Sequence, residues 1–239
     1  MNGDPTLRAR YEAVRDRIRT ACEAAGRPED SVRLLAVSKT FAAERVLALA
    51  DLGQRAFGES YLQEAQDKIS ACANERPDLP LEWHFIGPIQ SNKTRAVAEL
   101  FSWVHSVDRE KIARRLSEQR PGSLPALNVC LQVNISAEQT KSGCTREQAP
   151  ELARAIAALP RLRLRGVMAI PEPTEDVRRQ REQCAAVRGV FEALRGAWLD
   201  IDTLSMGMSD DLEAAIAEGA TIVRVGTALF GRRPVPGAA

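Results

Sequence analysis

The chain of 239 residues lacks several residue types and patterns, and each absence excludes a class of protein. Only two histidines are present, so a three-histidine metal site is impossible, and neither HExxH nor a zinc-type Cys/His spacing occurs. The five cysteines form no CxxC pair, which fits neither a disulfide framework nor a zinc knuckle. We therefore expect no metal site and a reducing compartment, the cytoplasm.

Net charge and long apolar runs are also lacking. Lys and Arg number 33 against 32 Asp and Glu, so no overall field attracts nucleic acid or an anionic membrane. No apolar run approaches the roughly 18 residues of a membrane span, and the charged start MNGDPTLRARYEAVRDRI does not resemble a signal peptide. Aromatic residues make up 5% of the chain, and the segments RLRLR and VRRQR have no aromatic platform for RNA beside them. The sequence predicts neither a nucleic-acid nor a membrane partner.

What is present is a regular alternation of helix and strand patterns. Apolar residues at three- and four-residue spacing predict a long helix over 6–24, which Gly26 and Pro28 end. Short apolar runs predict eight buried strands, at 32–38, 55–58, 82–87, 102–107, 127–134, 164–170, 202–207 and 221–226. Helical patterns lie between them, at 42–52, 61–73, after Ser91, and at 108–119, 146–158, 175–196 and 210–218.

This alternation predicts an α/β fold with parallel strands and right-handed crossovers. Eight strands close naturally into a single-domain (β/α)8 TIM barrel over residues 1–239, with an extra N-terminal helix. An open doubly wound sheet is the main alternative. Because no full helix pattern follows the last strand, we expect the N-terminal helix to cover that part of the barrel.

In a parallel barrel the carboxyl ends of the strands meet at one mouth, where ligand sites form. Lys39 directly follows the first predicted strand. Partial desolvation there would lower the pKa of the amine and suit it to form a Schiff base. A lysine that extends into solvent is the alternative interpretation.

The loops after the last two strands carry a pattern typical of an anion site. Gly207 and Gly226 allow backbone amides to approach an anion, and Ser209 and Thr227 add hydroxyl donors. A helix that begins near position 210 would direct its N-terminal dipole at the same place. The acids of DDLE at 210–213 are explained as a helix capping box.

An amine and a phosphate site in one mouth suggest a phosphate-bearing aldehyde cofactor, pyridoxal phosphate. Arg224 lies on the last strand just before the anion loop, where it could face the pyridine nitrogen. A permanent cation there would disfavour protonation of that nitrogen and make the ring a weak electron sink. The alternative for Arg224 is an outward, salt-bridged strand residue.

Seven motifs in chain order resemble the YggS/PROSC family of pyridoxal phosphate homeostasis proteins, which is similar to the N-terminal barrel of alanine racemase. They are VRLLAVSKT, FGESYLQEAQDK, EWHFIGPIQSNK, VHSVDREKIA, QVNISAEQTKSG, LRGVMAI and LSMGMSDDLEAAIAEGATIVRVGTALFG. The resemblance implies that Lys39 is the cofactor lysine and that Arg224 contacts the ring nitrogen. It also implies that Ser205, Met206, Ser209, Gly226 and Thr227 belong to the phosphate end.

The chain departs from the family pattern at two places. Ser60 stands where the family often has asparagine, and Pro88 stands where it often has histidine. Ser60 therefore reaches less far toward the ring, and no acid or base is assigned to position 88.

The sequence thus predicts a monomeric protein that holds pyridoxal phosphate as an internal aldimine and stores, buffers or delivers it, with no robust turnover. Apo-enzymes that use the cofactor are the expected partners, and Lys141 is a hypothetical second amine during transfer. The alternative is an amino-acid racemase or related enzyme in which Lys39 and Tyr61 transfer protons. A second domain with an opposing acid or base is not expected, because the chain ends after one barrel.

Overall fold

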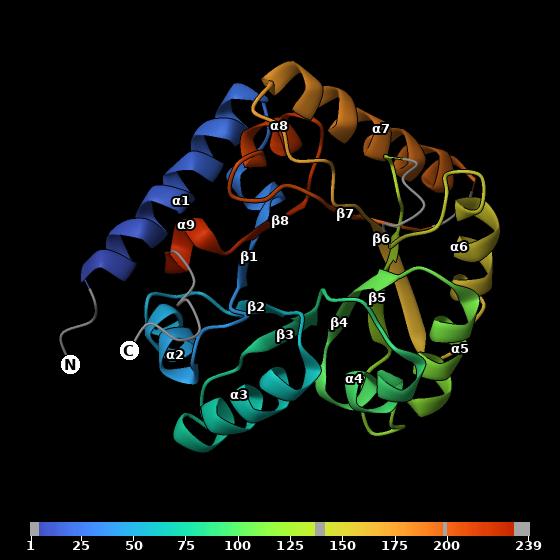
Figure 1. Ribbon diagram of the computed structural model, residues 1–239, viewed down its shortest axis with the longest axis horizontal. Coiled ribbons are helices and arrows are strands. Elements are labelled where there is room, and N and C mark those ends of the chain that lie inside the picture. The colour runs from blue at the N-terminus through green and yellow to red at the C-terminus, as the bar shows by residue number, and fades with distance from the viewer. Residues whose placement is uncertain (1–4, 137–141, 198–199, 232–239) are drawn as a thin grey trace.

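The computed structural model describes residues 5–136, 142–197 and 200–231. Eight parallel strands form a closed barrel in chain order, surrounded by helices (Figure 1). The strands are β1 (Arg33–Val37), β2 (Ala56–Glu59), β3 (Glu82–Phe85), β4 (Trp103–Val107), β5 (Leu127–Gln132), β6 (Leu162–Met168), β7 (Thr203–Ser205) and β8 (Ile222–Val225). Because β1 pairs with β8, the predicted barrel is confirmed and the open sheet is excluded.

The helices alternate with these strands as the sequence pattern predicts. They are α1 (Pro5–Ala24), α2 (Ala43–Asp51), α3 (Leu62–Glu75), α4 (Thr94–Leu100), α5 (Glu110–Gln119), α6 (Ala149–Ala157), α7 (Val177–Gly196), α8 (Leu212–Ala217) and α9 (Thr227–Phe230), with short 3-10 turns η1 (Glu29–Ser31) and η2 (Ser91–Lys93). The predicted strand at 202–207 is shorter than expected. It ends before Gly207, whose φ of +95° turns the chain away from the sheet.

The N-terminal helix covers the part of the barrel where only the short α9 follows β8, as expected. In Figure 1, α1 lies along α8 and α9 on the outer side of the barrel, and it packs against both. Arg17 of α1 forms an ion pair with Glu213 at 2.7 Å and donates a hydrogen bond to the Ser209 carbonyl at 2.9 Å. The first helix is therefore attached to the loop that follows β7.

Buried apolar side chains form one large cluster and two small ones. The larger core lies between the strands and the helices that surround them. The smaller apolar groups consist of Leu35, Ala56 and Ile222 in one and Trp103, Cys130 and Met168 in the other. All five cysteines are buried and free, so the expectation that no disulfide framework exists is confirmed.

Within the described ranges, no helix combines the length and the apolar character that a membrane span requires. In the same ranges, no three histidine, cysteine or acidic side chains gather closely enough to hold a metal ion.

Candidate functional site

A cavity of about 220 Å³ opens at the carboxyl ends of β1, β2, β7 and β8. Its lining consists of Val37, Lys39, Phe41, Ser60, Ile86, Ile170, Met208, Ser209, Asp210, Arg224, Gly226 and Thr227. Six of the eight residues proposed from the sequence are among them: Lys39, Ser60, Ser209, Arg224, Gly226 and Thr227. The fold thus brings the amine, the cation and the anion loop into one space.

Lys39 is half-buried and lies in a chain segment that its neighbours hold on both sides. The Ser38 hydroxyl donates to a Glu59 oxygen at 2.6 Å. On the other side, Thr40 has a φ of 71°, a left-handed conformation that costs a residue with a side chain about 1–2 kcal/mol. The Thr40 amide donates to Glu64 at 2.5 Å, which stabilises this turn.

Lys68 connects the groups that hold this segment. Its ammonium donates to Glu59 at 2.6 Å, to Glu64 at 2.8 Å and to the Ser38 carbonyl at 2.8 Å. The side chains of Lys68 and Glu59 are 3% and 0% exposed. Burial raises the pKa of Glu59, while the Lys68 charge opposes this rise. All three ammonium hydrogens of Lys68 are engaged, so Lys68 supports the segment and is no second nucleophile.

Arg224 is buried, 4% exposed, and donates only to uncharged groups. Its guanidinium contacts the Ser205 carbonyl at 2.7 Å, the Ser205 hydroxyl at 2.8 Å and the Ala169 carbonyl at 2.8 Å. No carboxylate of the described ranges lies within ion-pair distance of it. Burial lowers the pKa of Arg224 to about 10. The outward, salt-bridged interpretation is therefore wrong.

The predicted anion site consists of the two loops that follow β7 and β8. The Ser209 hydroxyl accepts a hydrogen bond from the Ala228 amide at 3.3 Å, and Thr227 begins α9. A Cβ atom at Gly226 would lie 3.2 Å from the Val37 carbonyl, so a side chain there would crowd β1. Gly226 therefore allows the loop to pass close to the strand that delivers Lys39.

The capping box expected at 210–213 is wrong. The helix α8 begins one residue later than the box requires, and its N-cap residue Asp211 makes no side-chain capping bond. Asp211 instead accepts from the Met208 amide at 2.5 Å, within the preceding loop. Glu213 pairs with Arg17 of α1, an interaction between distant segments that the local pattern could not reveal.

Ser205 and Met206 do not line the cavity. Met206 is buried in the apolar core. Ser205 is also fully buried, and its hydroxyl lies within hydrogen-bond distance of Arg224 and His105. In this structure the Ser205 hydroxyl contacts a group of the site instead of facing the cavity. Lys141 lies outside the described residues.

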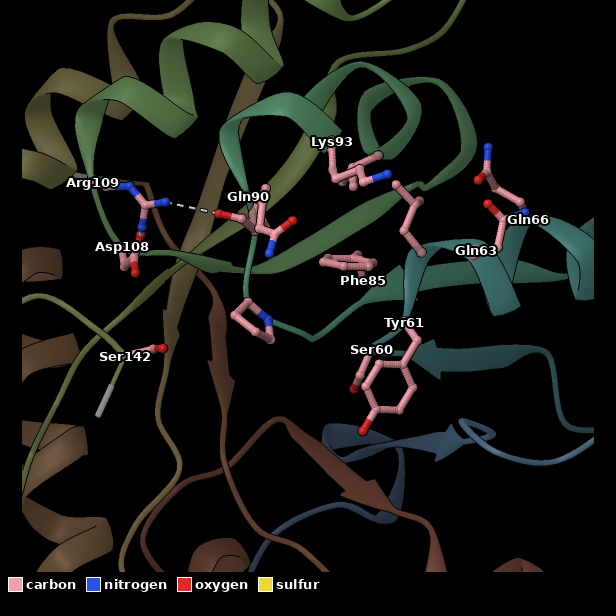
Figure 2. A pocket seen from close by; sticks show the side chains of 14 residues that line it. Ser60, Tyr61, Gln63, Gln66, Phe85, Gln90, Lys93, Asp108, Arg109 and Ser142 are labelled. Carbon is pink, nitrogen blue, oxygen red and sulfur yellow. Dashed lines mark hydrogen bonds and ion pairs between the residues drawn. The ribbon is translucent and has the colours of Figure 1, made fainter. Parts of the chain in front are cut away.

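A second, larger cavity of about 600 Å³ shares Ser60 with the first, and Figure 2 shows the side chains that line it. Residues of α3, β3 and the loops after β3, β4 and β5 line it. Tyr61, which is 54% exposed, belongs to this cavity and does not line the one that contains Lys39. Ser60 lines both cavities. The pair proposed for proton transfer is therefore divided between two spaces.

Sequence reasoning missed half of the lining. Val37, Phe41, Ile86, Ile170 and Met208 give the cavity an apolar wall, and in the sequence they cannot be distinguished from core residues. Asp210 is also in the lining, and its carboxylate is exposed. Solvent screens such a charge, so Asp210 opposes an anionic ligand only weakly.

Comparison with known proteins places the barrel in a class. A family model described as alanine racemase, N-terminal domain, matches residues 10–234. A crystal structure of an unknown protein from Bifidobacterium adolescentis superposes with a TM-score of 0.88 at 35% identity, over 94% of each chain. The fold and the site thus define a barrel of the alanine racemase N-terminal type.

The relatives narrow this class. The pyridoxal phosphate homeostasis protein of Pseudomonas aeruginosa is 60% identical over 228 residues, which cover 95% of this chain and 96% of that protein. PipY of Synechococcus elongatus, solved with PLP bound, has a TM-score of 0.75 at 35% identity, and the match covers 91% of this chain and 100% of PipY. The chain belongs to the pyridoxal phosphate homeostasis protein family, as its motifs suggest.

Proposed function

We propose that this protein binds pyridoxal phosphate in the cavity lined by Lys39, Arg224 and the loops after β7 and β8, and that it stores, buffers or delivers the cofactor. One observation carries the proposal. A half-buried primary amine, a buried cation without a carboxylate partner in the described ranges and an anion-type loop line the same cavity. The relatives named for this function, and PipY with PLP bound, support it.

The donor set of the cavity matches the chemistry of the cofactor. The phosphate would be held by the hydroxyls of Ser209 and Thr227 and by the backbone at Gly226. Val37, Ile86 and other apolar residues would cover the faces of the ring and exclude water. No group of the set needs to be displaced for these roles.

When bound, pyridoxal phosphate supplies an aldehyde that condenses reversibly with a primary amine and a ring that can accept electrons. Lys39 would supply the amine. Arg224 would meet the pyridine nitrogen as a donor only, because a guanidinium has no acceptor atom. Its positive charge would keep a proton off that nitrogen, and a ring in that state withdraws electrons weakly. This environment favours holding the cofactor over turning a substrate over.

The geometry does not favour the racemase alternative, which needs Tyr61 opposite Lys39. Incubation of the loaded protein with L-alanine in deuterated water tests this alternative. Steady formation of the D-isomer with solvent deuterium would favour the enzyme, whereas a spectral change without product would favour the carrier.

The binding proposal is tested by the covalent attachment of the cofactor. The protein is mixed with pyridoxal phosphate, reduced with borohydride, desalted and weighed by mass spectrometry. We expect one reduced cofactor per wild-type chain and essentially none per Lys39→Ala chain, with the visible absorption band lost in the variant. The loss should be close to complete, because no other amine among the described residues lines the cavity.

Lys93→Ala is the matched control. Lys93 lines only the neighbouring cavity of Figure 2, so removal of its amine should leave attachment unchanged. Equal labelling of wild type and Lys39→Ala, or loss of labelling in Lys93→Ala alone, would contradict the proposal.

We further propose that the protein works as a monomer in the cytoplasm and passes the cofactor to apo-enzymes. Light scattering of the purified protein tests the monomer. Transfer is tested by adding the loaded protein to an apo-enzyme that requires pyridoxal phosphate, with a phosphatase present to remove free cofactor. Reactivation that survives the phosphatase supports direct delivery, and reactivation that the phosphatase abolishes contradicts it.

A further inference from the structure

Arg224 lies at one end of a chain of hydrogen bonds that runs through polar side chains of β3, β4 and β7. From Arg224 the contacts lead to the Ser205 hydroxyl at 2.8 Å, then to His105 at 2.9 Å, His84 at 2.9 Å and Glu82 at 2.5 Å. Glu82 also pairs with Arg33, the first residue of β1, at 2.8 Å. This series of contacts thus extends from Arg33 and Glu82, at the amino ends of β1 and β3, to Ser205 at the carboxyl end of β7.

These polar groups occupy positions where a barrel normally packs branched apolar residues. Ser205, His84 and His105 are each 0% exposed. Buried polar side chains destabilise a core unless every member has a partner. Here each one does, since the ring nitrogens of both histidines and the Ser205 hydroxyl are all engaged.

We propose that Glu82, His84, His105 and Ser205 form a directional hydrogen-bond relay that positions Arg224 toward the cofactor ring. These four are positioning residues, because none of them lines the cavity. The relay is a property of the protein without cofactor, whereas its effect on the cofactor depends on the function proposed above.

The charges at the two ends determine where each proton of the relay lies. A carboxylate only accepts, so His84 must donate to Glu82 from Nε2, and its neutral ring then accepts at Nδ1. His105 must therefore donate from Nε2 to His84 and accept at Nδ1. The remaining proton is that of Ser205, whose hydroxyl donates to His105 while its oxygen accepts from Arg224.

The ionisation of these groups agrees with this arrangement. Burial lowers the pKa of His84 despite the opposing effect of Glu82. Burial, together with the repulsion that a protonated His84 and the Arg224 cation would exert, holds the pKa of His105 well below its ordinary value. Both rings are therefore neutral near pH 7. Burial acts to raise the pKa of Glu82, but its contacts with His84 and Arg33 outweigh this effect, so Glu82 remains an anion.

The relay holds the Arg224 cation through the neutral Ser205 hydroxyl in place of an adjacent carboxylate. An adjacent carboxylate would engage both guanidinium nitrogens and neutralise the charge locally. Here the Ser205 contacts hold NH1 and the Ala169 carbonyl holds NH2, while the anion Glu82 begins a different strand. Arg224 is thereby fixed in orientation and keeps its positive charge for the ring nitrogen.

The proton arrangement can be tested directly, because the chain contains only two histidines. Nitrogen-15 NMR of the cofactor-free protein reports which ring nitrogens carry protons, and the spectra of His84→Phe and His105→Phe assign them. We expect both rings to be neutral with the proton on Nε2 at pH 7 to 8. A proton on Nδ1 of either ring, or a charged ring in this range, would overturn the relay.

The effect on Arg224 is tested on the loaded protein. Ser205→Ala removes the hydroxyl and should weaken cofactor retention about tenfold, the size of one lost hydrogen bond to a charged group, and should shift the absorption band. Ser205→Thr keeps a hydroxyl and should restore both. Cys22→Ala, a fully buried truncation on α1, should change neither.

The outcomes separate this inference from the proposed function. If Ser205→Ala and His105→Phe both fold and match wild type in band and retention, the relay does not act on Arg224, and the inference fails. If Ser205→Thr does not fold, His105→Phe supplies the second break in the relay. If wild type takes up no pyridoxal phosphate, the proposed function fails, while the NMR result still decides whether the relay exists.

Discussion

Lys68 and Arg224, the two buried cations near the cavity that contains Lys39, are accommodated in opposite ways. Lys68 contacts two carboxylates, Glu59 and Glu64, and its charge is neutralised where it lies. Arg224 contacts two carbonyls and a hydroxyl, and the described residues offer it no adjacent carboxylate. The difference separates a structural cation from one whose charge remains available to a ligand. Burial alone would not have told them apart, because both side chains are nearly inaccessible.

The largest expected effect is on stability, at Lys68. Lys68→Met leaves Glu59 buried without its cation, and the second oxygen of Glu59 already has no hydrogen-bond partner among the described residues. We expect a loss of about 3–5 kcal/mol in the free energy of unfolding. Arg224→Met should cost less, about 1–3 kcal/mol, because it leaves only uncharged acceptors unpaired. Urea denaturation of the cofactor-free variants measures both.

The exposed pair Arg178–Glu182 supplies a control for this comparison. Its side chains are 87% and 63% exposed, so Arg178→Met should change stability by less than about 0.5 kcal/mol. An equal or larger loss for Arg224→Met than for Lys68→Met would mean that Arg224 is as strongly structural as Lys68.

The second expected effect is a pH dependence of stability. It comes from the two histidines in the relay that ends at Arg224. Their folded pKa values are below the ordinary 6.5, so the unfolded chain binds more protons as the pH falls. Stability should therefore decrease below about pH 6.5, with a slope of at most about 1.4 kcal/mol per pH unit for each histidine. Unfolding at pH 5 to 8 measures this slope.

His105→Gln isolates the contribution of one ring. The variant keeps a polar side chain but binds no proton, so the slope should fall by about one proton. Wild type and variant share every other titrating group, including Glu59, so the difference between them reports His105 together with its effect on its partner His84. Identical slopes would show that His105 has the same pKa in the folded and unfolded chain.

The smallest expected effect on stability is at Thr40, which shares the partner Glu64 with Lys68. Thr40→Gly removes the cost of the left-handed φ of 71°, although glycine also loses more backbone freedom on folding. The net result should be a gain of about 0.5 kcal/mol, measured by thermal unfolding. Thr40→Ala is the matched control, since it removes the same side chain but keeps the strain. A gain from alanine equal to that from glycine would argue against strain at this turn.

The sequence predicts those features of the site that depend only on the order of the strands and on where each strand ends. Lys39 and Arg224 were identified because each lies at or near the end of an apolar run, and closure of the barrel brings these ends together. The roles of Ser205 and His105 could not be predicted, because they depend on a contact between residues one hundred positions apart. The cluster around Lys68 has a weak local signal, the i, i+4 spacing of Glu64 and Lys68, which is also typical of an exposed helix face.

The wrong prediction of a capping box at 210–213 also results from a contact between residues far apart in the sequence. The residues at 210–213 fit the local motif, but Glu213 pairs with Arg17 from the other end of the chain, and a tertiary ion pair replaces the local bond. Local patterns are thus reliable for the elements of this barrel and less so for side chains that face another element.

The contact between Arg17 and the Ser209 carbonyl also bears on the order in which this chain is made. Arg17 holds the carbonyl of a residue that is synthesised 192 positions later. A nascent chain must therefore contain both segments before the loop after β7 has this support. A change in α1 should consequently affect that loop, which is distant from it in sequence but adjacent in space.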